Sequence, residues 1–180
     1  MSIRFVNIFV ALVFLLCSHL GLSNSCDRRY GICARAWKKW GESCYRITPQ
    51  PMAYDHAREA CRILGGEMAA PHSHHENDFM ASLVAVPGSR MWVACTDRGH
   101  EGEWECEGSR DGGGNFTNWC RGEPNNEGGA EHCAVILVSS KKWNDLGCEH
   151  SSPRAVCKQQ PRVRCFTTNN EGRLEADSCH

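Results

Sequence analysis

Thirteen cysteines in a chain of 180 residues restrict its fold more than any other feature of the sequence. Cys17 lies in an apolar N-terminal run, and the twelve cysteines that follow are an even number. In an oxidising compartment such cysteines pair as disulfides by default. The alternative, a zinc site built from cysteines, finds no support because the sequence has no Cys-x-x-Cys pair. At this length we expect one disulfide-braced domain.

The N-terminus predicts a secreted product. Arg4 precedes the apolar run Phe5–Cys17, and small residues such as Ser23 follow. A short positive region, an apolar core and a small-residue exit are typical of a signal peptide. The run is shorter than the roughly 20 residues of a membrane-spanning helix. We therefore expect residues 1–23 to be a signal peptide, with cleavage after Ser25 as the alternative, and the product to be secreted and extracellular, with no membrane insertion.

The charge balance argues against partners that are strongly anionic, such as nucleic acid or an anionic membrane surface. The chain has 20 basic and 21 acidic residues, for a formal net charge of −1. A protein that binds nucleic acid or an anionic membrane surface usually carries a marked basic excess. We therefore expect neither partner.

The pattern of apolar residues predicts two helices. Residues 52–64 place small and apolar side chains on one helical face, and Gly65-Gly66 follows as a stop. Ser73 and Glu76 form a capping-box pattern for a second helix that should run to about Val86, before Pro87. Its buried residues should be Phe79, Met80, Leu83 and Val84.

Short strands should surround these helices. We expect them at Tyr45–Ile47, Met91–Cys95, Cys133–Val138, around Trp143 and at Ala155–Cys157. Between Thr96 and His132 the chain is polar, rich in glycine and long for a plain connection, so this segment is expected to be functional. Helices and short strands in this order indicate the α+β class.

Several motifs, taken together and in order, resemble those of a known family. They are Cys33-x-x-x-Trp37, Cys44-Tyr45, Cys61 with Gly65-Gly66, Trp92-Val93, Glu123-Pro124-Asn125, Cys133-Ala134-Val135, Trp143-Asn144-Asp145 and Cys148 with Cys157-Lys158. The ordered set resembles the C-type lectin-like domain of the long form. The resemblance implies two helices flanking short antiparallel sheets, with a long Ca²⁺-binding loop. It divides the chain into a signal peptide (1–23), an N-terminal extension (24–32), the lectin domain (33–158) and a polar tail that contains cysteine (159–180).

The resemblance also implies three disulfides. They are Cys33–Cys44, Cys61–Cys157 and Cys133–Cys148. Outside the family pattern, Cys95 and Cys106 flank a polar segment between expected strands, and we expect them to pair. The pairing of Cys26, Cys120, Cys165 and Cys179 stays open. Cys120 has Cys165, Cys179 or another chain as partners, so a disulfide-linked or a non-covalent oligomer is left open.

Five side chains in the matched motifs carry the oxygen atoms that a calcium site needs. Ca²⁺ takes about six to eight oxygen ligands from carboxylates, amide carbonyls, backbone and water. The resemblance assigns Glu123, Asn125, Glu131, Asn144 and Asp145 to one Ca²⁺ ion, with the Asp145 carbonyl as a further ligand. It assigns the same residues to the sugar, because two neighbouring sugar hydroxyls complete the calcium shell in similar lectins.

The order of acid and amide predicts the class of sugar. A carboxylate only accepts hydrogen bonds, whereas an amide NH₂ donates them. Glu123-Pro124-Asn125 resembles the mannose-type members, in which the Glu-Pro bond is cis, and Gln-Pro-Asp is the galactose-type order. We therefore expect glycans with equatorial 3- and 4-hydroxyls, such as mannose, N-acetylglucosamine or glucose, or with the equivalent arrangement in fucose.

A second Ca²⁺ site is a further expectation. Asp97, Glu101, Asn126 and Glu131 match the positions at which collectin-like members hold an auxiliary ion. His132 stands where those members have another acid, and imidazole is a poor Ca²⁺ ligand. The competing interpretation is that Asp97 and Glu101 are solvated loop acids.

Smaller motifs complete the sequence-based expectations. Asn115-Phe116-Thr117 is an N-glycosylation sequon, which suits secretion. Trp104 and Trp119 are expected to anchor the loop, with sugar stacking as the alternative. The histidines at 72, 74 and 75 are expected at a polar helix entrance rather than in a metal site.

We therefore predict a secreted, calcium-dependent, carbohydrate-binding lectin, not an enzyme, with a role in innate recognition of microbes or cells. The alternative is a relative that keeps the fold but binds a protein, a mineral or ice. An enzyme reading would make Glu123 and Glu131 a glycosidase pair, but both acids are better explained as metal ligands.

Overall fold

The computed structural model describes residues 28–84, 86–107, 116–168 and 174–176. Its elements in chain order are β1 (Arg28–Ile32), β2 (Lys38–Trp40), β3 (Ser43–Ile47), α2 (Tyr54–Ile63), β4 (Glu67–Met68), α3 (His74–Ser82), β5 (Arg90–Thr96), β6 (Glu105–Cys106), the 3-10 turn η2 (Glu127–Gly129), β7 (Cys133–Leu137), β8 (Trp143–Leu146), β9 (Arg154–Gln159), β10 (Arg162–Thr168) and β11 (Leu174–Ala176). The expected signal peptide, the sequon at Asn115, Cys26 and Cys179 lie outside the described residues. The chain divides into two compact units, a main unit of residues 31–162 and a second unit formed by the two ends.

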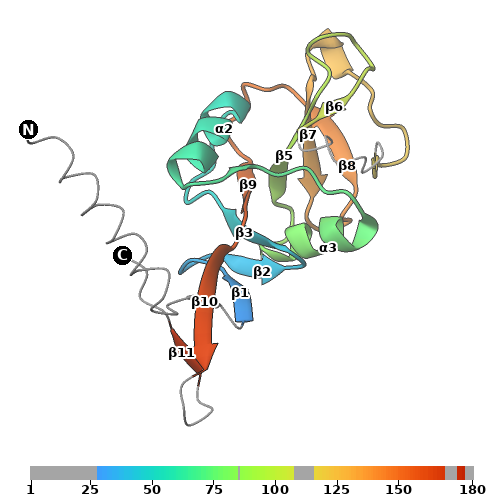
Figure 1. The fold of residues 1–180 in the computed structure, drawn as a ribbon. Coiled ribbons are helices and arrows are strands. Elements are labelled where there is room, and N and C mark those ends of the chain that lie inside the picture. Colours follow the sequence, from blue (N-terminus) through green and yellow to red (C-terminus); the bar gives the residue numbers. More distant parts are fainter. Residues whose placement is uncertain (1–27, 85, 108–115, 169–173, 177–180) are drawn as a thin grey trace, which may run out of the picture. The chain divides into compact units, whose positions relative to one another are not determined.

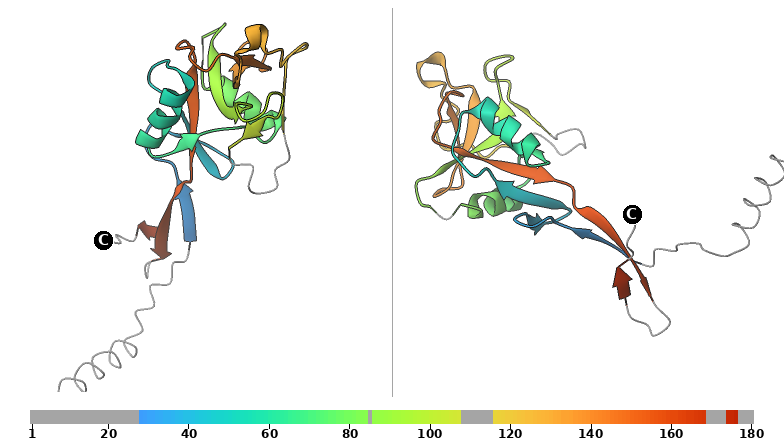
Figure 2. Two further views of the ribbon diagram at one scale, coloured as in Figure 1. Left: turned by 90° about the horizontal axis from the view of Figure 1, so that it is seen from above. Right: turned by 90° about the vertical axis from the view of Figure 1, so that its left-hand side faces the viewer.

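In the main unit, eight of the described strands form one sheet. The strand order is β2-β3-β9-β5-β7-β8, with β4 paired to β9 and β6 paired to β5. All these pairs are antiparallel except β5–β9, which is parallel. A parallel pair needs a long connection, and residues 97–153 supply it here. Helices α2 and α3 lie on different sides of β5 (Figures 1 and 2). Helices that are separate from a mostly antiparallel sheet confirm the α+β class.

The first predicted helix is observed almost as expected. Helix α2 buries Tyr54, Ala57 and Cys61, which are three and four residues apart and therefore on one face. Two glycines end it for different reasons: Gly65 has a φ of +87°, and a Cβ on Gly66 would lie 2.6 Å from the Lys158 carbonyl oxygen. Gly66 therefore lets the helix end pass directly against strand β9.

The second predicted helix is shorter than the sequence suggested. Its N-cap is confirmed, because the Ser73 side chain accepts a hydrogen bond from the Glu76 amide. It ends at Ser82 rather than near Val86. The last turn tightens, with the Leu83 amide bonded to the carbonyl three residues earlier, and Pro87 disfavours helical backbone at Val86. Of the four expected buried residues, Met80 is fully buried, and the others are partly buried against the core.

Two fully buried tryptophans tie the sheet to its surroundings. The Trp92 indole NH donates to the Met52 carbonyl at 2.8 Å, and the Trp143 indole NH donates to Asn77 Oδ1 at 2.7 Å. Since a buried NH without a partner is costly, these bonds fix the side chains that pack beneath strands β5 and β8.

Four disulfides form among the described cysteines, and all four were predicted. They are Cys33–Cys44, Cys61–Cys157, Cys95–Cys106 and Cys133–Cys148. The second of them connects α2 to β9 across 96 residues of sequence. The fourth connects β7 to the segment after β8.

The C-terminal segment differs from the plain polar tail expected for residues 159–180. It contains strands β10 and β11, which pair antiparallel, and together with β1 they form a three-stranded sheet. The alternation of arginine with Val163 and Cys165 in β10 is the period-two pattern of a strand, which its charge obscured.

Candidate functional site

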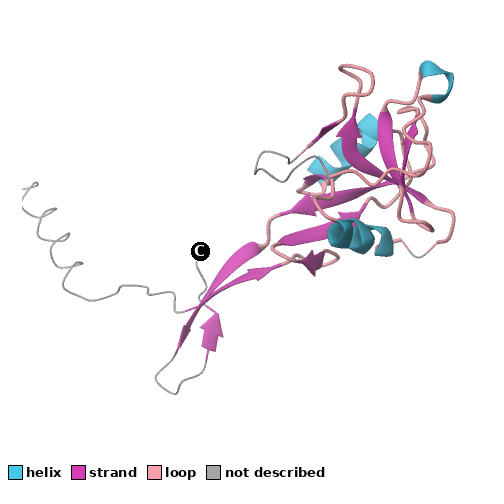
Figure 3. Ribbon diagram, turned by 90° about the vertical axis from the view of Figure 1, so that its right-hand side faces the viewer, coloured by secondary structure: helices cyan, strands magenta, loops and turns pink. Residues whose placement is uncertain are grey.

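The predicted calcium ligands come from one strand and one long loop. Asn144 and Asp145 lie on β8, opposite Val135 and Ala134 of β7. The loop leaves the sheet at Thr96 and returns at Cys133, which are paired residues of β5 and β7. It carries Glu123, Asn125 and Glu131. Figure 3 shows loop segments gathered around η2, the short helix at the upper right, at the end of the main unit away from α3.

Asp145 connects strand β8 to the loop through hydrogen bonds. The residue is fully buried, and its carboxylate accepts hydrogen bonds from two consecutive amides of the loop. The Asn125 amide lies 3.2 and 3.1 Å from its two oxygens, and the Asn126 amide lies 2.7 Å from Oδ2. A carboxylate on the rigid strand therefore sets the backbone of the loop directly after Pro124.

Glu123 points a carboxylate oxygen into this region without a partner. Its Oε2 is buried and makes no hydrogen bond. Burial raises the pKa of Glu123, and the neighbouring carboxylates of Asp145 and Glu131 raise it further. The Glu123–Pro124 peptide bond is cis, as the family resemblance implied. A buried acceptor with no donor among the described residues marks a place where a cation or a hydroxyl group fits.

Glu131 lies in the same electrostatic neighbourhood. Burial raises the pKa of its carboxyl group, and Asp145 and Glu127 act in the same direction, although the Glu127 amide donates a hydrogen bond to Oε2 at 3.2 Å and lowers it. The carboxylates of Asp145 and Glu131 therefore repel that of Glu123, and the carboxylate of Asp145 also repels that of Glu131. Such a cluster is stabilised by a bound cation.

The donor set fits Ca²⁺ by chemistry. Every predicted ligand presents oxygen, and the Asn144 side-chain amide contacts the Asp145 carbonyl oxygen, so these two groups lie together. The oxygens of Glu123, Glu131 and Asp145 do not all lie within 4.8 Å of one another. The fit to Ca²⁺ therefore rests on the chemistry of the donors, since Ca²⁺ takes oxygen ligands from carboxylates and amides.

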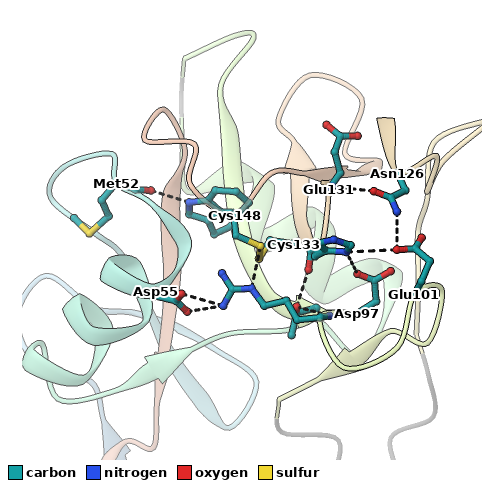
Figure 4. Close-up of a disulfide and its surroundings, with 12 residues drawn as sticks. Met52, Asp55, Asp97, Glu101, Asn126, Glu131, Cys133 and Cys148 are labelled. Atoms are coloured by element: carbon teal, nitrogen blue, oxygen red, sulfur yellow. Dashed lines mark hydrogen bonds and ion pairs between the residues drawn. A yellow bond between two sulfur atoms is a disulfide. The ribbon is translucent and has the colours of Figure 1, made fainter. Parts of the chain in front are cut away.

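The residues predicted for a second calcium ion come together with His132. One donor atom each from Asp97, Glu101 and His132 lies within 4.8 Å of the other two. Asn126 also reaches Glu101, through a hydrogen bond of 2.6 Å from Nδ2 to Oε2. Figure 4 shows Asn126 between Glu101 and Glu131, with dashed lines to both. Glu131 contributes its backbone amide to Asn126 Oδ1 at 3.0 Å.

The aromatic predictions are resolved in favour of packing. Trp104 and Trp119 contact each other with ring centroids 4.6 Å apart, and Trp119 packs on the buried Trp143 at 5.4 Å. These residues anchor the loop, as expected, rather than forming an open face. The histidines also follow expectation: His72 contacts Glu76 at the start of α3.

Cys120 carries a half-buried free thiol. Its pairing with Cys165, Cys179 or another chain stays a prediction. Its amide donates to the Trp143 carbonyl at 2.8 Å, which places the thiol at the base of the Glu123 segment.

Two residues near the site were not singled out from the sequence. Glu127, in η2, raises the pKa of both Glu123 and Glu131, and His150 lowers that of Glu131. Glu127 follows Asn125 by two positions in an acidic, glycine-rich stretch, which is a signal that could have marked it. His150 stands after Cys148 in a turn, and only the fold brings it close.

Comparison with known proteins identifies the family. The family model for the lectin C-type domain matches residues 50–159. The chain belongs to the C-type lectin family. It is 30% identical over 146 residues to the galactose-specific lectin nattectin of Thalassophryne nattereri, a match that covers 78% of this chain and 89% of the relative. It is also 30% identical over 132 residues to the hepatic lectin of Gallus gallus, covering 73% of this chain and 62% of that protein.

Solved structures agree with this assignment. The cow CD23 carbohydrate-recognition domain, crystallised in the presence of a GlcNAc2Man3 oligosaccharide, matches with a TM-score of 0.66 and 29% identity, covering 74% of this chain and 99% of the other. A calcium-independent type II antifreeze protein shares the fold, with a TM-score of 0.64 and 24% identity, covering 74% and 98%. The chain spans 62% and 37% of the length of two curated relatives, the chicken hepatic lectin and the mouse low affinity immunoglobulin epsilon Fc receptor. Within the described residues, no helix is long and apolar enough to span a membrane.

Proposed function

We propose that this protein is a secreted lectin that binds Ca²⁺ through Glu123, Asn125, Glu131, Asn144 and Asp145 and uses the ion to hold a mannose-type sugar. The observation that carries the proposal is the buried, unpartnered Oε2 of Glu123 beside the carboxylates of Asp145 and Glu131. Repulsion between these carboxylates makes their ionisation less favourable, and a bound divalent cation offsets that repulsion.

The side chains around the ion would recognise the sugar in a defined way. When bound, Ca²⁺ supplies coordination for two neighbouring sugar hydroxyls. Glu123 would accept a hydrogen bond from one hydroxyl, because a carboxylate only accepts, and the Asn125 amide would donate to the other. Exposure suits these roles: Asn125 is exposed and Glu123 is half-buried, whereas Asp145 below them is buried and fixed by the loop amides.

The mannose preference rests on the order of these two groups. The relatives give no single answer, because one is named a galactose-specific lectin and another was crystallised with a mannose-containing oligosaccharide. This chain has the acid at 123 and the amide at 125, on either side of Pro124. That asymmetry favours the pair of equatorial 3- and 4-hydroxyls.

Affinity chromatography tests the proposal. The protein should be retained on mannose resin in Ca²⁺, pass through galactose resin, and elute from mannose when a chelator is added. Glu103→Gln is the matched control, since it changes an exposed acid of the same loop that lies outside the proposed ligand set. Retention on mannose that survives the chelator would contradict the proposal.

The calcium-independent antifreeze protein supports a second candidate, a domain that keeps the fold for a partner other than sugar. That protein shares the architecture of this chain without depending on calcium. Binding to ice or to a protein surface in chelator, with no retention on any sugar resin in Ca²⁺, would favour it. We also propose that the chain is not an enzyme, because its relatives are lectins and receptors. Turnover of nitrophenyl glycosides would contradict that.

A further inference from the structure

Asp97, Glu101 and His132 offer two kinds of metal donor at one point. The Nδ1 atom of His132 lies 3.1 Å from Asp97 Oδ1 and 3.4 Å from Glu101 Oε2. Among the described residues, this is the one group of three or more histidine, cysteine or acidic side chains whose donor atoms all lie within 4.8 Å of one another. Figure 4 shows the carboxylates of Asp97 and Glu101 turned toward the same side chain, each joined to it by its own dashed line.

The surrounding backbone holds two of these donors in position. The Asp97 side chain is only 1% exposed, and its Oδ2 accepts from the Gly102 amide at 2.9 Å, which leaves Oδ1 facing His132. The His132 carbonyl accepts from Thr96 Oγ1 at 2.6 Å and from the Asp97 amide at 3.3 Å. Hydrogen bonds of this kind orient metal ligands before the ion arrives.

The donor set disagrees with Ca²⁺, the ion expected here from the family resemblance. Ca²⁺ takes about six to eight oxygen ligands. Here the third donor is an imidazole nitrogen, and Asn126 does not add an oxygen. Its Oδ1 accepts from the Glu131 amide at 3.0 Å, so its NH₂ group is the part that faces Glu101.

The same donors suit Zn²⁺. Zinc accepts histidine nitrogen and carboxylate oxygen at about 2.0–2.2 Å, and three protein ligands with one open position are a common arrangement. Two ligands on adjacent corners of a tetrahedron of that size are about 3.3 Å apart. The separations of 3.1 and 3.4 Å from His132 Nδ1 to the two carboxylates bracket this value.

We propose that Asp97, Glu101 and His132 form a zinc-binding site that is chemically distinct from the proposed calcium site. The ligands lie at the two ends of the long loop, directly after β5 and directly before β7. A bound Zn²⁺ ion links these ends and stabilises the base of the loop. The proposal does not depend on sugar binding.

Calorimetric titration of the full chain with zinc chloride, in excess Ca²⁺ to saturate the other site, tests this proposal. We expect one Zn²⁺ ion per chain and a rise in melting temperature on adding zinc. Glu101→Gln, on an exposed side chain that folding does not need, should weaken zinc binding at least about tenfold, the low end of what lost metal partners cost. The exposed Glu103 supplies the matched control, Glu103→Gln, which should bind zinc as the natural protein does.

His132→Asp separates zinc from calcium. It converts the group to oxygen donors alone, so zinc affinity should fall at least about tenfold. His75→Ala, on an exposed histidine of α3, should leave zinc affinity unchanged. The proposal would be overturned if Glu101→Gln and His132→Asp both bound zinc as the natural protein does. It would also be overturned if the natural protein bound no zinc in excess Ca²⁺.

Discussion

Two groups of poorly exposed acids in this molecule have opposite surroundings. Glu76, at the start of α3, is 4% exposed and is met by donors on every side. Its carboxylate accepts from the Tyr45 hydroxyl, from the His72 amide at 2.9 Å and from Lys158 Nζ at 3.0 Å. Burial opposes its ionisation, but these hydrogen bonds outweigh burial, so the pKa of Glu76 lies below its usual value.

Glu123 and Glu131 show the reverse. Burial raises the pKa of both, and nearby carboxylates raise it further: Asp145 acts on both acids, and Glu131 acts on Glu123. No cation among the described residues pairs with the buried oxygen of Glu123. A partnered acid such as Glu76 belongs to the fold. Glu123 lies near other carboxylates, and its buried oxygen has no partner among the described residues. An acid in such surroundings is a candidate ligand for a cation rather than a structural group.

The largest expected effect comes from neutralising the unpartnered acid. Glu123→Gln should reduce mannose binding at least about 100-fold, because a calcium ligand and an acceptor for the sugar are both lost. In Ca²⁺-free buffer its melting temperature should equal or exceed that of the natural protein, since a repelling charge is removed. Binding assays and thermal unfolding measure the two effects. If the mutant binds mannose normally, or unfolds at a clearly lower temperature without calcium, Glu123 is not the ligand that we contrast with Glu76.

Neutralising the partnered acid should do the opposite. Glu76→Gln leaves Lys158 without its ion pair and should lower the free energy of unfolding by about 2–3 kcal/mol. Mannose binding per folded molecule should be unchanged. Urea titration gives the first quantity and resin retention the second. The control is Glu59→Gln, whose exposed ion pair with Arg62 should contribute less than about 0.5 kcal/mol. If both variants lowered the free energy of unfolding equally, the buried contacts of Glu76 would contribute no more than an exposed ion pair.

The two groups that flank Pro124 allow a finer test. Glu123→Gln combined with Asn125→Asp exchanges donor and acceptor. We expect the ratio of galactose to mannose affinity to rise about tenfold, which corresponds to about 1.4 kcal/mol. Competition by free sugars on a glycan-coated surface measures this ratio. If the double variant still binds sugar with the natural preference for mannose, the hydrogen-bond account of specificity is wrong.

The smallest effect concerns pH. Because the pKa of Glu76 is lower in the folded chain, the unfolded chain binds more protons at that group, and the stability it contributes increases with pH. That contribution is complete above the unfolded value of about 4.3 and is lost as pH falls through the folded value. The stability difference between natural protein and Glu76→Gln, measured in Ca²⁺-free buffer, should therefore shrink across this acidic range. A difference that stays constant would remove Glu76 as the titrating group.

Much of the fold followed from local patterns. The apolar face of α2, the Ser73 cap and the β-branched run of β7 are local signals, and each produced the expected element. Strand β10 was missed because arginines and threonines mask its alternation. The end of α3 was placed too late because Pro87 marks where a helix must have stopped, not where it does stop.

The site was predicted as a set of residues but not as a geometry. Motif order identified the oxygen donors, whereas nothing local shows that Asp145 is buried or that it accepts from the Asn125 and Asn126 amides. The contribution of Glu127, the proximity of His150 and the convergence of His132 on two acids depend on how the loop folds back. Those are contacts between residues distant in sequence or separated by a turn, which periodicity does not encode.

The pairing of Thr96 with Cys133 has a consequence for how such proteins diversify. The chain between these residues starts and ends at one ladder position of the sheet, and the disulfides Cys95–Cys106 and Cys133–Cys148 lie on either side. The entropic cost of closing a loop grows only slowly with its length. Insertions, deletions or whole replacements in this stretch can therefore be grafted onto an unchanged frame, and new ligand preferences can arise without a new core having to evolve.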